Sequence, residues 1–312
     1  MTNNKSLTNK IDFAVIISVK RANPNGDPLN GNRPRQTYDG FGEISDVCLK
    51  RKIRNRLQDM GESIFVQSDD NRAVGDEFRS LNDRFKAALD RWENETKEKK
   101  IESADTRKNA PREWFDVRAF GQVFAFKKKG SGNNGKGTEN AEENADAVSV
   151  GIRGPVTIQS AFSIEPITPD SMQIVKSVNL ETEKNPDKKA SDTMGMKHRV
   201  DKGIYETYGA INTQLASKTG FSNDDAEKIK KAVQTLFVND ASSARPEGSM
   251  EIVKVIWWKH NSATGQYSSA EVHRSLNVQP DGTYKLDILE GLTPEELDPL
   301  EGEELNKHCV MG

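Results

Sequence analysis

The residues best suited to chemistry are the cations of one loop and of the helix pattern that follows it. The loop reads NPNGDPLNGNRPR over 23–35, and the helix pattern contains LKRKIR over 49–54. Loop amides, guanidiniums and ammoniums at one sheet edge suit a phosphate backbone better than a small uncharged substrate. The expected phosphate-binding residues here are Lys20, Arg21, Arg33, Arg35, Lys50, Arg51 and Arg54.

Acidic residues near the same loop allow a second kind of chemistry. Asp27, Asp39, Glu43 and Asp46 cluster in the sequence. Such carboxylates can position a metal or a general base for phosphodiester cleavage. The favoured interpretation is plainer, because Asp is common at turns and at helix starts.

Three other segments only partly match nucleotide-binding motifs. The stretch 130–137 lacks the Ser/Thr of a P-loop, so it indicates a flexible linker. The stretch 118–123 has Gln122 where RNA-recognition strands carry a stacking aromatic, which favours core packing of its phenylalanines. The stretch 151–154 indicates a turn that presents Arg153.

Metal and cofactor sites are not predicted. The four histidines are scattered, with no Cys-x-x-Cys or His-x-x-x-His pair. There is also no Gly-x-Ser-x-Gly nucleophile elbow. We therefore expect no cofactor, no metal and no catalytic constellation.

The composition predicts a soluble cytoplasmic protein. The chain has 312 residues, 34% of them hydrophobic and 30% charged, and no run approaches the roughly 20 apolar residues that span a bilayer. Its polar start lacks a signal-peptide core, and two cysteines favour a reducing compartment. We expect no membrane partner.

Charge is distributed unevenly along the chain, although the net charge is only −3. The first sixty residues carry an excess of Lys and Arg, whereas 287–304 contains only acidic charges. A solvated acidic tail is the common explanation for such a run. The sharper hypothesis is a repeating assembly in which an acidic edge of one copy meets a basic edge of the next.

Hydrophobic patterning predicts an α+β fold with βαββαβ order, the ferredoxin-like or RNA-recognition-like plan. The expected helices are 45–60, 77–95 and one capped by Ser222 with Asp225 three residues later. The remaining expected elements are strands at 11–20, 113–126, 148–164, 252–258 and 284–289, a charged loop at 96–110, a linker at 127–146 and a polar excursion at 165–203.

Several motifs in this order resemble a known family, the backbone subunit of the CRISPR Cascade surveillance complex, most closely its type I-C version. The resemblance extends from about residue 11 to 260. Besides the opening loop, it is carried by SDVCLKRKIRN from Ser45, WFDVRAFG from Trp114, GIRGPVTIQSAFS from Gly151, MGMKHRVDKGIYETYGAI from Met194, TGFSNDD from Thr219 and NDASSARPEG from Asn239.

The resemblance implies an RNA-recognition-like palm with a helical finger insertion and a thumb hairpin. The palm is expected at 11–60, 112–164 and 204–290, with a flexible linker at 127–147 inside it. The finger is expected at 61–111, the thumb at 165–203 and an acidic C-terminal segment at 291–312.

The resemblance also implies the function. Copies of the family's subunit polymerise along one CRISPR guide RNA, and each thumb displaces a base of the guide and its partner in the target DNA. The implied partners are guide RNA, the target DNA strand in the heteroduplex, copies of the chain and other Cascade subunits, and the subunit itself is not catalytic. The residues that the resemblance adds to the RNA-binding set are Ser45, Met194, Met196, Lys197, His198, Ser243 and Arg245, of which the last two face guide or neighbour. For the two methionines, flexible packing under the thumb is an equally open alternative to wedging between bases.

Two rival functions remain open at this point. Related backbone subunits of type III systems cut target RNA with a loop aspartate, and Asp27 or Asp39 lies in that region. A plain oligomerising scaffold without RNA is the other rival. In the leading hypothesis, Lys50→Ala together with Arg54→Ala abolishes RNA-dependent assembly and leaves the fold intact.

Overall fold

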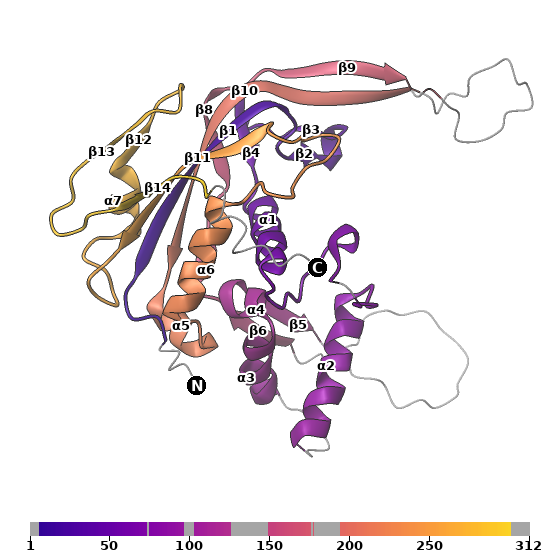
Figure 1. The fold of residues 1–312 in the computed structure, drawn as a ribbon, viewed down its shortest axis with the longest axis vertical. Coiled ribbons are helices and arrows are strands. Elements are labelled where there is room, and N and C mark those ends of the chain that lie inside the picture. Colours follow the sequence, from indigo (N-terminus) through magenta and orange to yellow (C-terminus); the bar gives the residue numbers. More distant parts are fainter. Residues whose placement is uncertain are drawn as a thin grey trace, which may run out of the picture.

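A computed structural model describes residues 6–73, 75–96, 103–125, 149–175, 177 and 194–300. Its centre is an antiparallel sheet in which β14, β11, β1, β10, β8 and β4 lie side by side in that order. Helices α1 (Asp46–Asp59) and α6 (Asn223–Gln234) lie on the same side of this sheet (Figure 1). The fold class is therefore α+β, as the patterning predicts.

Four strands and these two helices make the βαββαβ core. The strands are β1 (Ile11–Ala22), β8 (Ala161–Pro166), β10 (Met194–Ile211) and β11 (Met250–Lys259). β1 is the central strand and pairs with β10 along nearly its whole length, and with β11 on its other side. The resulting order β11-β1-β10-β8 is that of a ferredoxin-like sheet.

The predicted helix periodicity explains how α1 packs. Ser45 caps the helix by accepting a hydrogen bond from the Cys48 amide, and Leu49, Ile53 and Leu57 are fully buried against the sheet. α6 begins with the predicted capping box between Ser222 and Asp225. Local sequence signals therefore fix both helix starts.

The second face of the sheet is also covered. Alternate residues of β1, such as Ala14 and Ile16, belong to a separate apolar cluster with Trp258 and Val272. This layer contains α7 (Ser269–Arg274), β12 (Leu276–Val278) and β13 (Tyr284–Leu286). β13 pairs with β12 and not with the central sheet, so its strand signal marks a separate hairpin. Much of the sheet is thus closed to a ligand on both faces.

A helical unit lies beyond the end of α1 (Figure 1). It contains α2 (Leu81–Thr96), α3 (Ser103–Glu113), α4 (Phe115–Phe120), β5 (Gly121–Ala125) and β6 (Ser149–Arg153). Phe65, Phe85, Trp92, Trp114 and Phe124 share its core. The finger was expected at 61–111. In the structure its apolar core also includes residues from 114–124 and residue 150.

Two predictions for this unit are wrong. The segment expected as a charged loop at 96–110 contains α3 from Ser103, because Thr106 and Ala110 bury one side of an otherwise charged helix. The strand expected over 113–126 begins as helix α4 and becomes β5 only at Gly121, whose φ of 80° ends the helix. The helix expected from 77 starts at Leu81. The linker expected at 127–147 lies outside the described residues.

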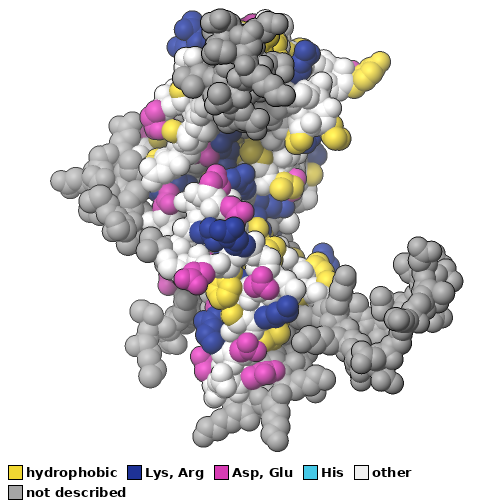
Figure 2. All heavy atoms as spheres, turned by 90° about the vertical axis from the view of Figure 1, so that its right-hand side faces the viewer, with side chains coloured by type: hydrophobic (Ala, Val, Ile, Leu, Met, Phe, Trp, Pro, Cys, Tyr) yellow, Lys and Arg dark blue, Asp and Glu magenta, His cyan; other side chains and the backbone are white. Residues whose placement is uncertain are grey.

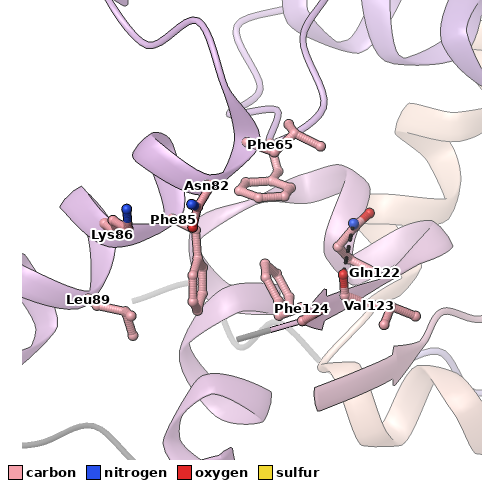
Figure 3. A pocket seen from close by; sticks show the side chains of 10 residues that line it. Phe65, Asn82, Phe85, Lys86, Leu89, Gln122, Val123 and Phe124 are labelled. Atoms are coloured by element: carbon pink, nitrogen blue, oxygen red, sulfur yellow. Dashed lines mark hydrogen bonds between the residues drawn. The ribbon is translucent and has the colours of Figure 1, made fainter. Parts of the chain in front are cut away.

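A pocket of about 790 Å³ opens between α2 and β5. Phe65, Phe85 and Phe124 line it, and Figure 3 shows Phe85 on the helix side facing Phe124 on the strand side. The rings of Phe85 and Phe124 are 4.6 Å apart. The pocket is therefore an extension of the aromatic core of this unit.

The polar excursion at 165–203 contains a long β-ribbon instead of irregular chain. β9 (Pro169–Val175) pairs antiparallel with the start of β10, from Val200↔Pro169 to Met194↔Val175. Figure 1 shows this ribbon leaving the sheet and running over the end of α1 at which β2 and β3 lie. Sequence periodicity missed it because both faces of a projecting ribbon meet solvent and need no apolar alternation.

The acidic end is tied to the sheet in its described part. β14 (Glu295–Leu297) pairs with β11 as an edge strand. Lys230 contacts Glu295 at 2.9 Å, Lys254 contacts Asp298, and Tyr284 donates to Glu296. Three acids of this segment thus have partners within the chain.

The remaining elements are short. In the described part of the chain, no helix has the length and apolarity that crossing a membrane requires. The short elements are β2 (Gly26–Asp27), β3 (Arg33–Pro34), β4 (Phe41–Ile44), β7 (Val156–Ile158), α5 (Thr213–Thr219) and two 3-10 turns at Pro28–Asn30 and Asp69–Asn71.

Candidate nucleic-acid interface

Three segments that are distant in sequence meet at one edge of the sheet. The Asn25 side chain accepts hydrogen bonds from both the amide and the hydroxyl of Ser45, each at 2.9 Å, which joins the opening loop to the start of α1. The Asn23 amide donates to the Ala244 carbonyl at 2.9 Å, which joins the same loop to residues 239–248. All three segments are motifs of the sequence resemblance, and side-chain and backbone hydrogen bonds hold them together.

A buried ion cluster fixes the loop at 239–248 against α1. The Lys52 ammonium is 4% exposed and contacts the Asp240 carboxylate, which also accepts from Arg245 Nε at 3.1 Å. Burial lowers the pKa of Lys52, while Asp240 opposes that shift. Burial likewise raises the pKa of the neighbouring Cys48 thiol, so this cysteine is a poor nucleophile.

Most of the predicted cations surround these three segments. Their ion pairs are exposed or half-exposed: Arg21 lies 3.7 Å from Asp201, Lys50 2.9 Å from Asp46, and Arg51 3.1 Å from Asp70. Such pairs contribute little stability, so phosphates can replace the carboxylates. Lys20 and Arg33 are also exposed, and Arg35 is half-buried 3.7 Å from Asp27. Figure 2 shows Lys and Arg side chains gathered in the hollowed middle of one face, between the two ends of the molecule.

Backbone strain is concentrated in the same place. Among the described residues, the non-glycine residues with positive φ are Arg21, Asn32 and Asn239, with φ of 54°, 60° and 59°. All three lie in or beside the segments that meet here. Asn tolerates this conformation, but Arg rarely adopts it. Strained residues persist where surrounding structure fixes them, and they are frequent at binding sites.

Arg54 differs from the other predicted cations because it points into the protein. Its Nε donates to Asp116 Oδ2 at 3.0 Å, and its guanidinium lies 5.1 Å from the centre of the Phe120 ring. Its side chain is 14% exposed and that of Asp116 only 1%. Arg54 therefore links α1 to α4, and Arg54→Ala is not the neutral substitution that the sequence led us to expect.

The other predicted residues lie in three further places. Arg153 ends β6 in the helical unit, apart from the loop edge. Met194 and Met196 are 63% and 55% exposed on the ribbon. Lys197 follows them, whereas His198 is buried and shares a hydrogen bond of 2.8 Å with Ser171. Ser243 is exposed in the 239–248 loop beside Arg245.

Three of the four acids of the opening region have structural partners. Asp27 accepts from the Leu29 amide at 3.2 Å, Glu43 accepts from the Ser160 hydroxyl, and Asp46 pairs with Lys50. Asp39 is exposed. The described residues contain no group of three or more His, Cys, Asp or Glu placed to hold a metal ion. The capping interpretation accounts for Asp27.

One cation of this region was missed by sequence reasoning. Lys202 pairs directly with Lys20 across β1 and β10, and both line a cleft of about 710 Å³ with Asp201, Gly203 and Asp281. Like charges directly opposite destabilise a sheet, and the acids Glu165, Asp201 and Asp281 of the same cleft offset this pair. No sequence signal could have found it, because strand register is set by tertiary structure.

Comparisons with known proteins agree with the sequence resemblance. A protein-family profile described as CRISPR-associated protein Cas7 matches residues 9–291. The CRISPR-associated protein Cas7 of Haloferax volcanii (strain ATCC 29605 / DSM 3757) is 41% identical over 66 residues, which cover 21% of this chain and 19% of that protein. The matched stretch is thus about a fifth of the curated relative's length.

Two solved structures are also similar to this chain. One is described as a CRISPR RNA-guided surveillance complex, pre-nicking, with a TM-score of 0.42 and 14% identity over 80% of this chain and 78% of that chain. The other is described as a CRISPR RNA-guided surveillance complex, with a TM-score of 0.40 and 13% identity over 80% and 68% of the two chains.

The fold defines an α+β protein with a ferredoxin-like sheet and a basic loop edge. Because the family profile covers nearly all of the chain, the protein belongs to the CRISPR-associated protein Cas7 family.

Proposed function

We propose that the chain is the backbone subunit of a CRISPR surveillance complex of type I-C character, and that it binds guide RNA at the loop edge. Copies follow one another along the guide and assemble with other Cascade subunits in the cytoplasm. The subunit reads backbone and shape, and base pairing between guide and target DNA reads sequence.

The observation that carries the proposal is the meeting of three separate motifs around Asn23 and Asn25. Their contacts place Lys20, Arg21, Arg33, Arg35, Lys50, Arg51 and Arg245 at or beside one edge of the sheet. Four of these cations are exposed and three, Arg35, Lys50 and Arg245, are half-buried. Sequence-independent phosphate binding requires accessible cations on a rigid frame. Lys202, which is exposed and pairs with Lys20 across β10 and β1, adds a further cation to this surface.

The β9–β10 ribbon is the proposed thumb. It projects from the sheet, and Met194 and Met196 expose long apolar side chains on one of its faces. An apolar wedge of this kind unstacks bases in other nucleic-acid complexes. We propose that the ribbon enters the guide–target heteroduplex and displaces one base pair, so that the duplex is held in short segments.

The proposed role is not catalytic. The type III-like ribonuclease alternative needs a loop aspartate placed for cleavage, and Asp27 is engaged in capping the turn that follows it. Incubating the assembled complex with complementary RNA and Mg²⁺ tests this directly. Periodic RNA cleavage that is lost in Asp27→Ala or Asp39→Ala would replace the proposal with the ribonuclease.

Guide binding is tested by substituting cations whose ion pairs lie at the surface and contribute little to stability. Lys50→Ala combined with Arg51→Ala removes two exposed ion pairs and leaves the buried Arg54 contact intact. We expect loss of copurified RNA, seen as a lower 260/280 absorbance ratio, and loss of RNA-dependent oligomers in size exclusion. The matched control is Arg79→Ala with Lys86→Ala, two exposed cations near the start of α2.

The expected result is a defect only in the first double variant, together with binding that weakens steeply with salt in the wild-type protein. If both double variants retain a uniform RNA of repeat-spacer length, the loop edge is not the guide site. If the wild-type protein carries no RNA and still oligomerises, the chain is a plain scaffold.

A further inference from the structure

A second basic surface lies on α3, in the helical unit and away from the loop edge. A hollow of about 650 Å³ separates one face of α3 from the end of α5. The cations that line it are Arg107, Lys108, Arg112, Arg118 and Lys218. Figure 1 shows α3 beyond the end of α1 that is opposite to β2 and β3. The proposed guide site does not account for these residues.

The hollow continues into a neighbouring one. A second hollow of about 440 Å³ lies between α3 and α2, and it shares Lys108 and Arg112 with the first. These two side chains therefore lie between two adjoining depressions. An extended groove of this kind fits a polymer better than a single small anion.

The charge of the groove is positive because its acids are largely paired already. Asp225 accepts two hydrogen bonds from Arg118, at 2.9 and 3.0 Å, and Glu113 pairs with Arg91 and accepts from Trp92 Nε1 at 2.7 Å. Within the described part of the chain, only the exposed Glu95 lines the groove without such a partner. Four cations of the groove are exposed: Arg107, Lys108, Arg112 and Lys218. Among the described residues, no carboxylate lies within ion-pair distance of these four side chains.

Folding explains only part of this cluster. Arg112 and Lys218 lie in the last turns of α3 and α5, where the helix dipole favours cations. Arg107 and Lys108 lie in the middle of α3, and Lys108 is four residues before Arg112, a like-charge spacing that weakens a helix. Helix stability therefore does not account for the pair of Lys108 and Arg112.

The lining of the groove distinguishes between two kinds of anionic partner. Protein interfaces need apolar or aromatic anchors in a dry centre. In the hollow beside α5, Ala104 is the one apolar side chain among the described residues. In the hollow between α3 and α2, the apolar side chain is Trp92, which is buried and donates a hydrogen bond to Glu113. Phosphates need only charges and donors, which this surface supplies.

We propose that the α3 groove, formed by Arg107, Lys108, Arg112 and Lys218, is a second nucleic-acid site. It binds the phosphate backbone of a strand other than the guide, without reading its sequence. Such a site holds DNA while the loop edge retains the guide RNA. The proposal goes beyond the guide site, since it uses none of the same residues.

The test uses the full chain in its RNA-loaded form and labelled DNA without complementarity to the guide. Arg107→Glu with Lys108→Glu is compared with Arg79→Glu with Lys86→Glu, which removes the same charge from exposed positions near the start of α2. Fluorescence anisotropy is measured across a salt series. The groove variant is expected to bind duplex DNA about tenfold more weakly, with a salt slope smaller by about two.

Copurified guide RNA and the oligomer profile are expected to stay at wild-type levels in both variants, which separates this proposal from the guide site. Running single-stranded and duplex DNA in parallel identifies the strand form that the groove prefers. Equal DNA affinity of the two variants overturns the proposal. So does loss of oligomers in the groove variant with unchanged DNA binding, because that result assigns the groove to a protein partner.

Discussion

Arg54 on α1 and Asp116 on α4 form a nearly buried ion pair, with Nε 3.0 Å from Oδ2. The Asp116 carboxylate also accepts the backbone amides of Phe65, at 2.7 Å, and Val66, at 3.0 Å. This one carboxylate therefore joins the sheet helix, the helical unit and the segment between them. A cation that the sequence places in an RNA-binding motif is in the structure a connection between two parts of the fold.

The first prediction follows from this pair. Arg54→Ala should lower the free energy of unfolding by about 2–4 kcal/mol, because it leaves Asp116 buried without its counter-charge. Lys50→Ala, whose ion pair is exposed, should change it by less than about 0.5 kcal/mol. Urea unfolding of both variants measures the difference. Equal stability of the two would mean that Arg54 has no structural role.

A second prediction concerns the close approach of β10 to β1. A Cβ at Gly209 would overlap the ring of Phe13, which is fully buried and stacks on Trp257 with ring centres 5.4 Å apart. Gly209→Ala should therefore destabilise the protein by about 2–3 kcal/mol. Gly151→Ala is the control, since a Cβ there meets nothing within 4 Å. Thermal unfolding should separate the two variants clearly, and a wild-type melting temperature for Gly209→Ala would contradict the packing described here.

A third prediction concerns pH. Burial lowers the pKa of His273, which lies 3.6 Å from Asp12 and stacks on Tyr208. The unfolded chain therefore binds a proton more readily than the folded one as pH falls below the ordinary histidine value of about 6.5. Stability should be fully present above that pH and decline below it. Equilibrium unfolding between about pH 7.5 and 5.5, roughly one unit on each side of the ordinary histidine value, measures the slope.

The control for the pH effect is His273→Phe, which keeps a ring against Tyr208 and removes the titrating group. Its stability should depend less on pH in this window, whatever its absolute value. A slope identical to that of the wild-type protein would assign the pH dependence to other groups.

Asp12 adds a further loss of stability at lower pH. Burial acts to raise the pKa of Asp12, but hydrogen bonds from His260, Ser269 and Lys10 lower this pKa overall.

The last prediction tests the ribbon. Met194 and Met196 are two residues apart on one strand, so they share a face. Met194→Ala with Met196→Ala should leave the melting temperature unchanged, because both side chains are exposed. In the assembled complex it should remove the periodic reactivity of displaced guide bases in chemical probing. Met172→Ala with Ile174→Ala changes the opposite face of the ribbon and is the control. The same loss of periodicity in both variants would exclude a specific methionine wedge.

Elements whose signals lie in consecutive residues could be predicted from the sequence. Leu49, Ile53 and Leu57 repeat at helical spacing and are buried as predicted, and the Ser222 capping box starts α6 where it was expected. The α+β class is confirmed, but the core strand β10 was not among the predicted strands, and the strand predicted at 113–126 contributes only β5, which lies outside the central sheet. Local hydrogen bonds and periodic burial leave a record in consecutive residues, so sequence alone is sufficient for them.

Tertiary structure decided the rest. α3 was predicted as a loop because its charges conceal the two small residues, Thr106 and Ala110, that it buries. Lys20 meets Lys202, and Arg54 meets Asp116, only after strands and helices that are far apart in sequence have packed. Whether a cation binds a phosphate or a buried carboxylate depends on its neighbours in space, and the order of residues does not record those neighbours.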